Sequence, residues 1–125
     1  MKHLKSAVIA LMVAALSLLT QPLQVQAEVC TGINQSLNPL GYQQLAVSNT
    51  AVGVTLPAKG TVRVAIIQVE ANPIRFRDDG TDPTASVGTL INPNVTIVVC
   101  GSAIGRFRAI RSGSDASLSI GFYGN

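Results

Sequence analysis

Apolar and polar residues alternate with a period of two along several short segments of the chain, and turn-forming residues separate these segments. Such a pattern is typical of β-strands, and regular spacing of short strands favours a sandwich. It predicts an all-β fold, a single antiparallel β-sandwich of jelly-roll or immunoglobulin-like type, after an N-terminal signal-peptide helix. No segment beyond residue 27 sustains a helical period, and residues 28–41 have the composition of an irregular lead-in. We expect strands over residues 42–47, 52–57, 61–70, 73–77, 95–100, 106–111 and 116–123.

The predicted strands differ in the cover they require. The last one places Leu118, Ile120 and Phe122 on one face and small polar residues on the other, so only one face meets the core. Segments 61–70 and 95–100 are apolar on both faces. Either they are central strands of a two-layer core, or one apolar face meets another subunit.

The N-terminus has the three-part layout of a secretory signal, with Lys2 and Lys5 before an apolar run and a small residue, Ala27, at the end. The apolar run from residue 7 to residue 19 is shorter than the roughly 18 to 20 residues that span a bilayer. We therefore expect a signal peptide over residues 1–27 and one domain over residues 28–125. That domain is expected to act in the periplasm or outside the cell and to meet the membrane only during export.

Removal of the signal changes the charge balance. The whole chain has a formal charge of +3, but without Lys2 and Lys5 seven positive and six negative side chains leave +1. A nearly neutral domain lacks the broad positive field on which nucleic-acid affinity depends, so no nucleic-acid partner is expected.

Two cysteines, Cys30 and Cys100, remain in the exported chain. Because an exported protein meets an oxidising compartment, we expect them to form a disulfide. Closing a loop of this length stabilises the fold by roughly 4 kcal/mol in the chain-entropy model.

The chain lacks the residues that most catalytic sites require. Its only histidine, His3, leaves with the signal, so neither a Ser-His-Asp triad nor a histidine-containing zinc site can form. A disulfide would leave no reactive thiolate. Hydrolysis by two carboxylates would need a pair fixed across a cleft, and no pattern in the sequence indicates one. We therefore expect no enzymatic activity, no cofactor and no metal site.

The segment RFRDDGTDPTAS, residues 75–86, concentrates charge in a chain that is only 12% charged. We expect its first residues to form a strand in which Phe76 faces the core and Arg75 and Arg77 face solvent. Turns should follow at Asp79-Gly80 and Asp82-Pro83. A second segment, GRFRAIR at 105–111, repeats the alternation. If the two strands lie close together, their charged side chains form a candidate contact loop of Arg75, Arg77, Asp78, Asp79, Asp82, Arg106 and Arg108.

Four interpretations of this loop are open. The arginines can hold the aspartates in a self-neutralising network. The oxygens of Asp78, Asp79 and Asp82 can bind calcium, although their spacing departs from the EF-hand pattern. The arginines can form a platform for an acidic glycan or nucleic acid, with Phe76 and Phe107 available for stacking. The loop can also meet the arginines of another subunit.

The block RFRDDGTDPTAS, followed by GRFRAIR and LSIGFY, resembles small proteins of tailed-phage and prophage genomes that carry an RxRDDGTxPTAS block. The similar region runs from Ala51 to Gly124. The resemblance implies a compact β protein of a virion or prophage structural module, such as a head or tail accessory subunit, and it transfers no catalytic residue. The export signal and the cysteine pair depart from that pattern and favour recruitment as an envelope or surface protein.

These observations predict a non-enzymatic exported structural or interaction protein, either a phage-like virion accessory or a surface subunit. Protein partners, including further copies of itself, are expected. In a filament or adhesin subunit, the C-terminal strand ending in Phe122 and Tyr123 would pair edge to edge. The alternative is a secreted binding module that recognises an acidic or carbohydrate ligand through the arginines of the candidate contact loop.

Overall fold

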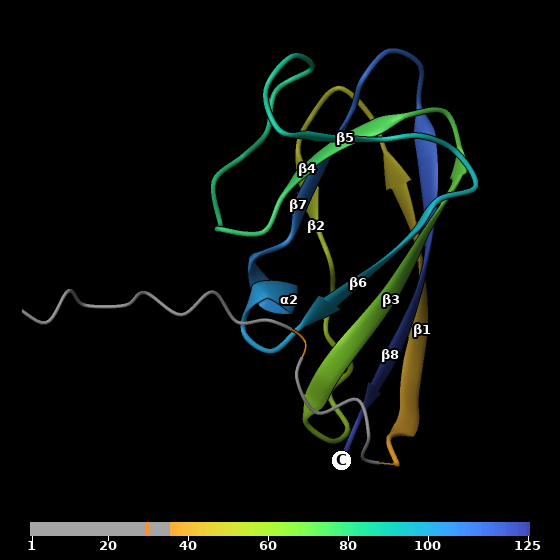
Figure 1. The fold of residues 1–125 in the computed structure, drawn as a ribbon, viewed down its shortest axis with the longest axis vertical. Helices are drawn as coiled ribbons and strands as arrows, with labels where there is room; N and C mark the ends of the chain where they lie inside the picture. Colours follow the sequence, from red (N-terminus) through yellow and green to blue (C-terminus); the bar gives the residue numbers. More distant parts are fainter. Residues whose placement is uncertain (1–29, 31–35) are drawn as a thin grey trace, which may run out of the picture.

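The computed structural model describes Cys30 and residues 36–125 (Figure 1). The expected signal peptide, residues 1–27, and its cleavage site lie outside the described residues. The elements are β1 (Asn38–Val47), β2 (Val52–Gly53), β3 (Val62–Ala71), β4 (Ile74–Arg77), β5 (Thr89–Ile91), β6 (Thr96–Cys100), α2 (Ala103–Arg106), β7 (Arg108–Arg111) and β8 (Ala116–Gly124).

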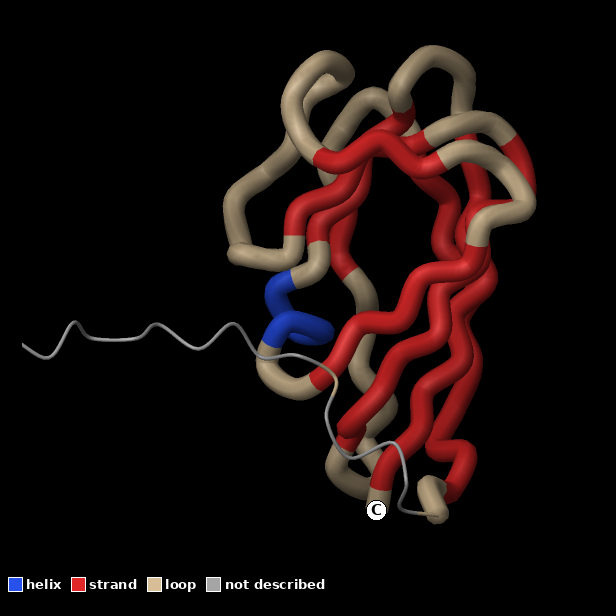
Figure 2. Tube along the Cα trace, in the orientation of Figure 1, coloured by secondary structure: helices blue, strands red, loops and turns tan. Residues whose placement is uncertain are grey.

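The strands form two antiparallel sheets that pack face to face. The first sheet has the order β1-β8-β3-β6 and the second the order β2-β7-β4-β5. Figure 2 shows the two layers, with most of the long loops at the end opposite the C-terminus. The all-β sandwich predicted from the alternating pattern is confirmed.

The pairing between the strands is nested. β4 pairs with β5, β3 with β6, β2 with β7 and β1 with β8, all antiparallel. The chain therefore resembles one long hairpin whose tip is the loop between β4 and β5. Successive pairs lie in opposite sheets, and this arrangement brings the two ends of the hairpin, β1 and β8, together.

The core lies between the sheets and follows the predicted alternation. On β8, Leu118, Ile120 and Phe122 are at most 1% exposed, as expected. They oppose Val69, Ile67 and Ala65 of β3 respectively. The second sheet contributes Ile74 and Ala109, and Ile104 and Phe107 close the core beside α2.

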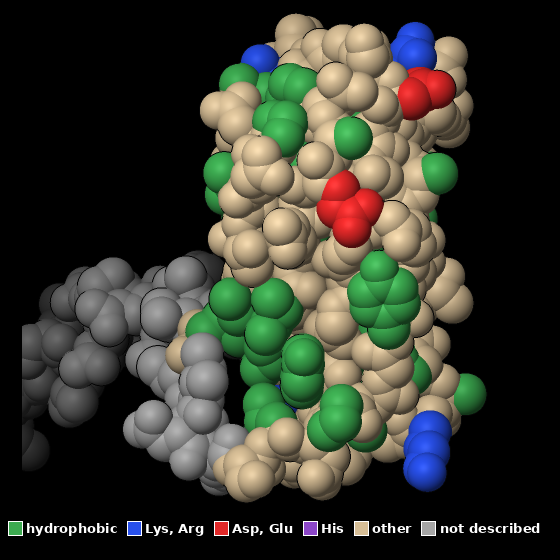
Figure 3. Space-filling model, turned by 90° about the vertical axis from the view of Figure 1, so that its right-hand side faces the viewer, with side chains coloured by type: hydrophobic (Ala, Val, Ile, Leu, Met, Phe, Trp, Pro, Cys, Tyr) green, Lys and Arg blue, Asp and Glu red, His purple; other side chains and the backbone are tan. Residues whose placement is uncertain are grey.

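The outer face of the first sheet carries an exposed row of apolar side chains. Tyr42, Gly121, Ile66 and Val98 occupy one cross-strand row. Of these, Tyr42 is 65%, Ile66 39% and Val98 47% exposed, and we call these three the outer apolar row. Figure 3 shows this side of the molecule, where apolar side chains gather over the lower half. Of the two alternatives for segments 61–70 and 95–100, cover on both faces within one chain does not hold at Ile66 and Val98. Cover of this face by another subunit stays a prediction.

β1 begins inside the predicted irregular lead-in. The lead-in was expected to reach residue 41, but the strand starts at Asn38 and has a register shift between Pro39 and Gly41. A proline is compatible with this position because β1 is an edge strand, on which one side needs no ladder hydrogen bond.

The second sheet differs from the prediction at two edge strands. The strand expected over 52–57 is limited to β2, because beyond it the N–H of Thr55 donates to the side-chain oxygen of Gln43 on β1 (2.9 Å). The chain thus leaves the second sheet and turns toward the first. β5 was not predicted, since its three residues are too few to show an alternation.

The strand expected over 106–111 begins at Arg108 instead. The preceding residues form α2, a four-residue helical turn whose last residue is Arg106, and the N–H of Phe107 donates to the oxygen of Ile104 (3.3 Å). A turn of four residues is too short to show a helical period, so the sequence pattern gave no sign of it. Phe107 and Ala109 are nevertheless buried, as the alternation predicted.

The C-terminal strand is not an edge. β8 lies between β1 and β3 and pairs with both of them. The prediction that residues up to Tyr123 would pair edge to edge with another molecule is therefore wrong, since both edges of the strand are already occupied.

The predicted disulfide joins Cys30 to Cys100, with 5.5 Å between the Cα atoms. It ties Cys30 to the end of β6, on the opposite edge of the first sheet from β1. Within the part of the chain that the structure describes, no helix has the length and apolar character needed to span a membrane.

Candidate contact loop

The residues of the candidate contact loop lie on β4, on α2 and β7, and in the segment 78–88 that joins β4 to β5 at the tip of the nested hairpin. Arg75 and Arg77 stand on the outer face of the second sheet, where Arg77 is directly opposite Arg108 of β7. Phe76 faces the other way, opposite Ala109, as predicted. The two arginine-containing segments are therefore adjacent, and the loop of residues 78–88 folds back over their outer face.

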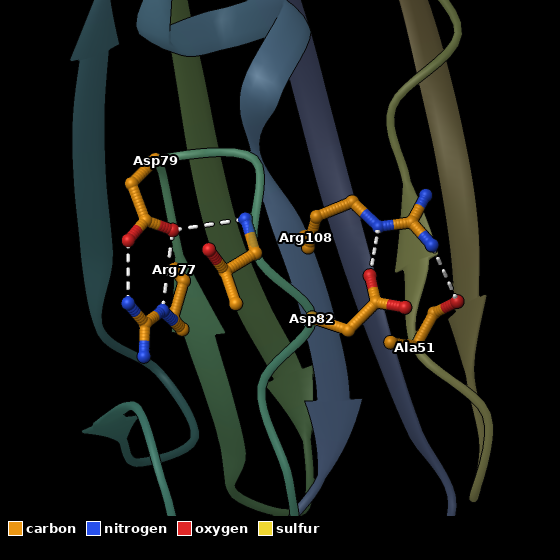
Figure 4. Close-up of polar contacts among 6 residues, drawn as sticks. Ala51, Arg77, Asp79, Asp82 and Arg108 are labelled. Atoms are coloured by element: carbon orange, nitrogen blue, oxygen red, sulfur yellow. Dashed lines mark hydrogen bonds and ion pairs between the residues drawn. The ribbon is translucent and has the colours of Figure 1, made fainter.

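Arg77 and Asp79 form a two-point ion pair (Figure 4). Arg77 Nη2 donates to Asp79 Oδ2 at 2.5 Å and Nε donates to Oδ1 at 3.2 Å, while the N–H of Thr81 donates to the same carboxylate at 3.0 Å. The hydrogen bond from Arg77, with that from Thr81, holds the pKa of Asp79 well below its usual range. The same pairing raises the pKa of Arg77. Asp79 therefore acts as a fixed anion that closes the first turn of the loop.

Arg108 connects the middle of the loop to the opposite edge of the second sheet (Figure 4). Its Nε donates to Asp82 Oδ1 at 2.6 Å and its Nη2 donates to the carbonyl of Ala51 at 3.1 Å. Gly53 leaves room for this guanidinium, because a Cβ there would lie 3.1 Å from Arg108 Nη1. Arg108 thus joins Asp82 of the loop to Ala51, the residue immediately before β2.

Among the residues that the structure describes, Arg75 has no carboxylate partner. Its Nε donates to the carbonyl of Ala85 at 2.9 Å and its Nη1 to that of Gly88 at 2.8 Å. Gly88 has a φ of 125°, and a Cβ there would approach the backbone oxygen of Phe76 to 3.0 Å. Arg75 therefore holds the second half of the loop by its backbone, and the predicted pairing of arginines with aspartates applies only to Arg77 and Arg108.

Arg106 and Asp78 take no part in these ion pairs. Arg106 Nη2 donates to the hydroxyl of Ser102 at 3.1 Å, and its side chain passes beside Gly80. Asp78 is exposed and forms no hydrogen bond or ion pair with any residue that the structure describes. Five of the seven predicted residues thus fix the loop, one lies beside it and one is free.

The carbonyl groups of Ala51, Ala85 and Gly88 are functional parts of this arrangement that the sequence did not indicate. Every residue has a carbonyl, so no residue type marks an acceptor. The turn at Thr84 carried a weak signal, because threonine hydroxyls often bond to the backbone two or three residues later. Its Oγ1 accepts from the N–H of Ser86 and that of Val87.

A shallow hollow of about 380 Å³ opens beside the loop, lined by Phe76, Arg77, Asp78, Asp79, Gly88 and Thr89. The ring of Phe76 is stacked on that of Phe107, with 5.3 Å between centroids, so its main contact is with the core. The calcium interpretation gains no support, because no three histidine, cysteine or acidic side chains of the described residues come together as a metal site.

Comparisons of the chain with protein-family models, with curated proteins and with solved structures found no match. The resemblance to phage and prophage proteins therefore remains a prediction from the residues.

Proposed function

We propose that this chain is an exported, non-enzymatic structural protein that acts through protein contacts, as a phage-like virion accessory or a surface subunit. The main support for this proposal is the nested pairing of its eight strands. We interpret that pairing as a jelly roll rather than an immunoglobulin-like sandwich, since eight strands folded as one long hairpin are the jelly-roll arrangement. Jelly rolls recur in viral capsid proteins.

The chemistry of the surface supports the same proposal. The charges of the candidate contact loop are largely engaged with the chain's own groups, since Arg77 and Arg108 hold aspartates and Arg75 holds carbonyls. The outer apolar row, in contrast, remains exposed on an extended sheet. An apolar exposed row favours a protein partner over a small charged ligand.

The disulfide supports a location in the periplasm or outside the cell. Disulfides persist in oxidising compartments and are rare in the cytosol. The bond between Cys30 and Cys100 is therefore in keeping with cleavage after Ala27 and export of residues 28–125.

Light scattering and co-sedimentation test this function. We expect the exported protein to form concentration-dependent oligomers, or to sediment with purified virions or with envelope fractions of the producing cells. A protein that stays monomeric at every concentration and sediments with neither would contradict the proposal.

The hollow beside the loop favours one second function, a binding module for an acidic or carbohydrate ligand. Jelly rolls also occur in lectins, and Arg77 and Asp78 at the hollow offer a donor and an acceptor. On a glycan array, binding that is lost in Arg77→Gln and Asp78→Asn but retained in Arg63→Gln would support it. Arg63 is exposed and outside the hollow, so binding that survives all three changes would eliminate the site.

A further inference from the structure

Among the strands that the structure describes, β1 has the longest unpaired edge. Four strands lie at sheet edges: β1 has ten residues, β6 five, β5 three and β2 two. One side of β1 pairs with β8 along its whole length. On its other side, no backbone hydrogen bond joins it to another described residue. In an antiparallel strand, alternate residues direct both N–H and C=O away from the paired neighbour, so a row of donors and acceptors faces outward.

The usual protection of such an edge is almost missing from β1. Natural proteins blunt edge strands with charged residues, prolines, bulges or short length. The sequence has no Lys, Arg, Asp or Glu from residue 31 to residue 58. Pro39 and the register shift before Gly41 affect only the start of the strand. The segment 42–47 is regular and uncharged. The side chain of Gln43 accepts a hydrogen bond from the N–H of Thr55 (2.9 Å), but the backbone groups on this side of the segment have no described partner.

The side chains beside this edge define the chemistry of a partner. On the outer face, Tyr42, Gln44 and Ala46 are neutral and exposed. A charged peptide would gain no ion pair from these three side chains, and the carboxylate of Glu70 on the same face already accepts hydrogen bonds from Gln44, Ser117 and Ser119. An uncharged strand would meet no electrostatic repulsion at this edge. The β1 strand of a second copy is such a strand, and two copies can pair antiparallel around a two-fold axis.

We propose that β1 docks antiparallel against β1 of a second copy, which joins the two first sheets into one continuous sheet. A pairing centred on Gln44 would set Tyr42 of each copy beside Ala46 of the other, a large residue beside a small one. The outer apolar rows of the two copies would then lie on the same face of the joined sheet. This inference rests on the proposed function, and it names the partner and the surface.

Amide hydrogen exchange of the exported, disulfide-bonded protein tests the pairing directly. We expect light scattering to show a monomer–dimer equilibrium at concentrations up to about 1 mM. As the dimer forms, exchange should slow at alternate amides of residues 42–47, namely those that face away from β8. The amides already bonded to β8 should show no such change.

Two double variants separate edge pairing from contact between sheet faces. Tyr42→Lys/Ala46→Lys adds two charges beside the edge, and we expect the dissociation constant to rise by about tenfold or more, since like charges would face each other across the axis. Ile66→Lys/Gln68→Lys adds the same charge to the same face on β3, away from the edge, and should leave dimerisation unchanged. Circular dichroism and thermal unfolding of both variants check that the fold is retained.

The outcomes distinguish this inference from the proposed function. A dimer whose β1 amides stay unprotected, or one that the β3 variant disrupts, overturns edge pairing and leaves a protein-contact function standing. A monomer at every concentration also overturns edge pairing. In that case co-sedimentation with virions or envelope fractions decides the proposed function separately.

Discussion

At the scale of single residues, three arginines of the candidate contact loop bind three different kinds of partner. Arg77 neutralises Asp79, Arg108 joins Asp82 to the carbonyl of Ala51, and Arg75 bonds only to carbonyls. An arginine fork can accommodate all three because its donors point in several directions. These three arginines therefore hold a loop of eleven residues, 78–88, in which Pro83 is the one buried residue.

Asp79 should make the stability of the protein depend on pH. Its pKa in the folded chain is lowered, so its stabilising contribution is complete above the pKa of an unfolded aspartate, about 3.9, and is lost as the pH falls through the lower folded value. Urea unfolding should therefore show that Asp79→Asn is destabilising near about pH 7 and that this cost shrinks toward about pH 2.

Asp78→Asn is the matched control, since Asp78 is the adjacent carboxylate and has no bonding partner in the described structure. A cost of Asp79→Asn that is the same at both pH values would show that the carboxylate charge does not stabilise the loop.

Arg108 should contribute measurably to stability although it is partly exposed. Arg108→Ala removes bonds to both Asp82 and Ala51, and we expect a loss of about 1 kcal/mol in the free energy of unfolding. Arg63→Ala, at an exposed position whose side chain forms no hydrogen bond or ion pair with a described residue, should change it by less than about 0.5 kcal/mol. Equal effects of the two changes in chemical denaturation would argue against a special role for Arg108.

At the scale of the elements, β3 shows how the two faces of one strand differ. Ile67 is fully buried between the sheets, whereas its neighbour Ile66 belongs to the outer apolar row and is 39% exposed. Isoleucine thus occurs at two consecutive positions, one in the core and one on the surface. Comparing the same substitution at both positions gives the difference in the free energy that each side chain contributes to folding.

Truncation of these isoleucines should have unequal costs. Ile67→Ala should lower the free energy of unfolding by about 2–5 kcal/mol, since it opens a cavity in the core. Ile66→Ala should cost less than about 1 kcal/mol in the monomer, because its side chain is already partly hydrated. Similar costs, measured at a concentration where the protein is monomeric, would show that the outer face is covered in the folded chain.

At the scale of the whole molecule, two devices close the long hairpin. The pairing of β1 with β8 joins the ends of the fold, and the disulfide fixes Cys30 at the far edge of the same sheet. The sequence separation between the cysteines is 70 residues, so their bond restricts most of the unfolded chain.

Removal of the disulfide should therefore be costly. In the chain-entropy model, Cys30→Ala/Cys100→Ala should lower the free energy of unfolding by roughly 4 kcal/mol, as measured in denaturant without reductant. Treatment of the wild-type protein with reductant should produce a similar shift and leave the double variant unchanged. Two free thiols in the exported protein by mass spectrometry would contradict the bond itself.

The sequence alone determined the class of the fold and the direction in which most side chains point. Alternation with period two is a property of each strand by itself, so Phe122 in the core and Arg77 on the surface followed from local pattern. The cysteine pairing followed as well, because only two cysteines are present.

Tertiary structure alone decided which strands became neighbours and which atoms Arg75 and Arg108 bind. The register that sets Arg77 opposite Arg108, the carbonyl of Ala51 as an acceptor and the position of β8 between two strands depend on contacts between segments distant in sequence. The exposed edge of β1 is of the same kind, since a strand's sequence predicts its faces but its position in the sheet decides whether its backbone is paired.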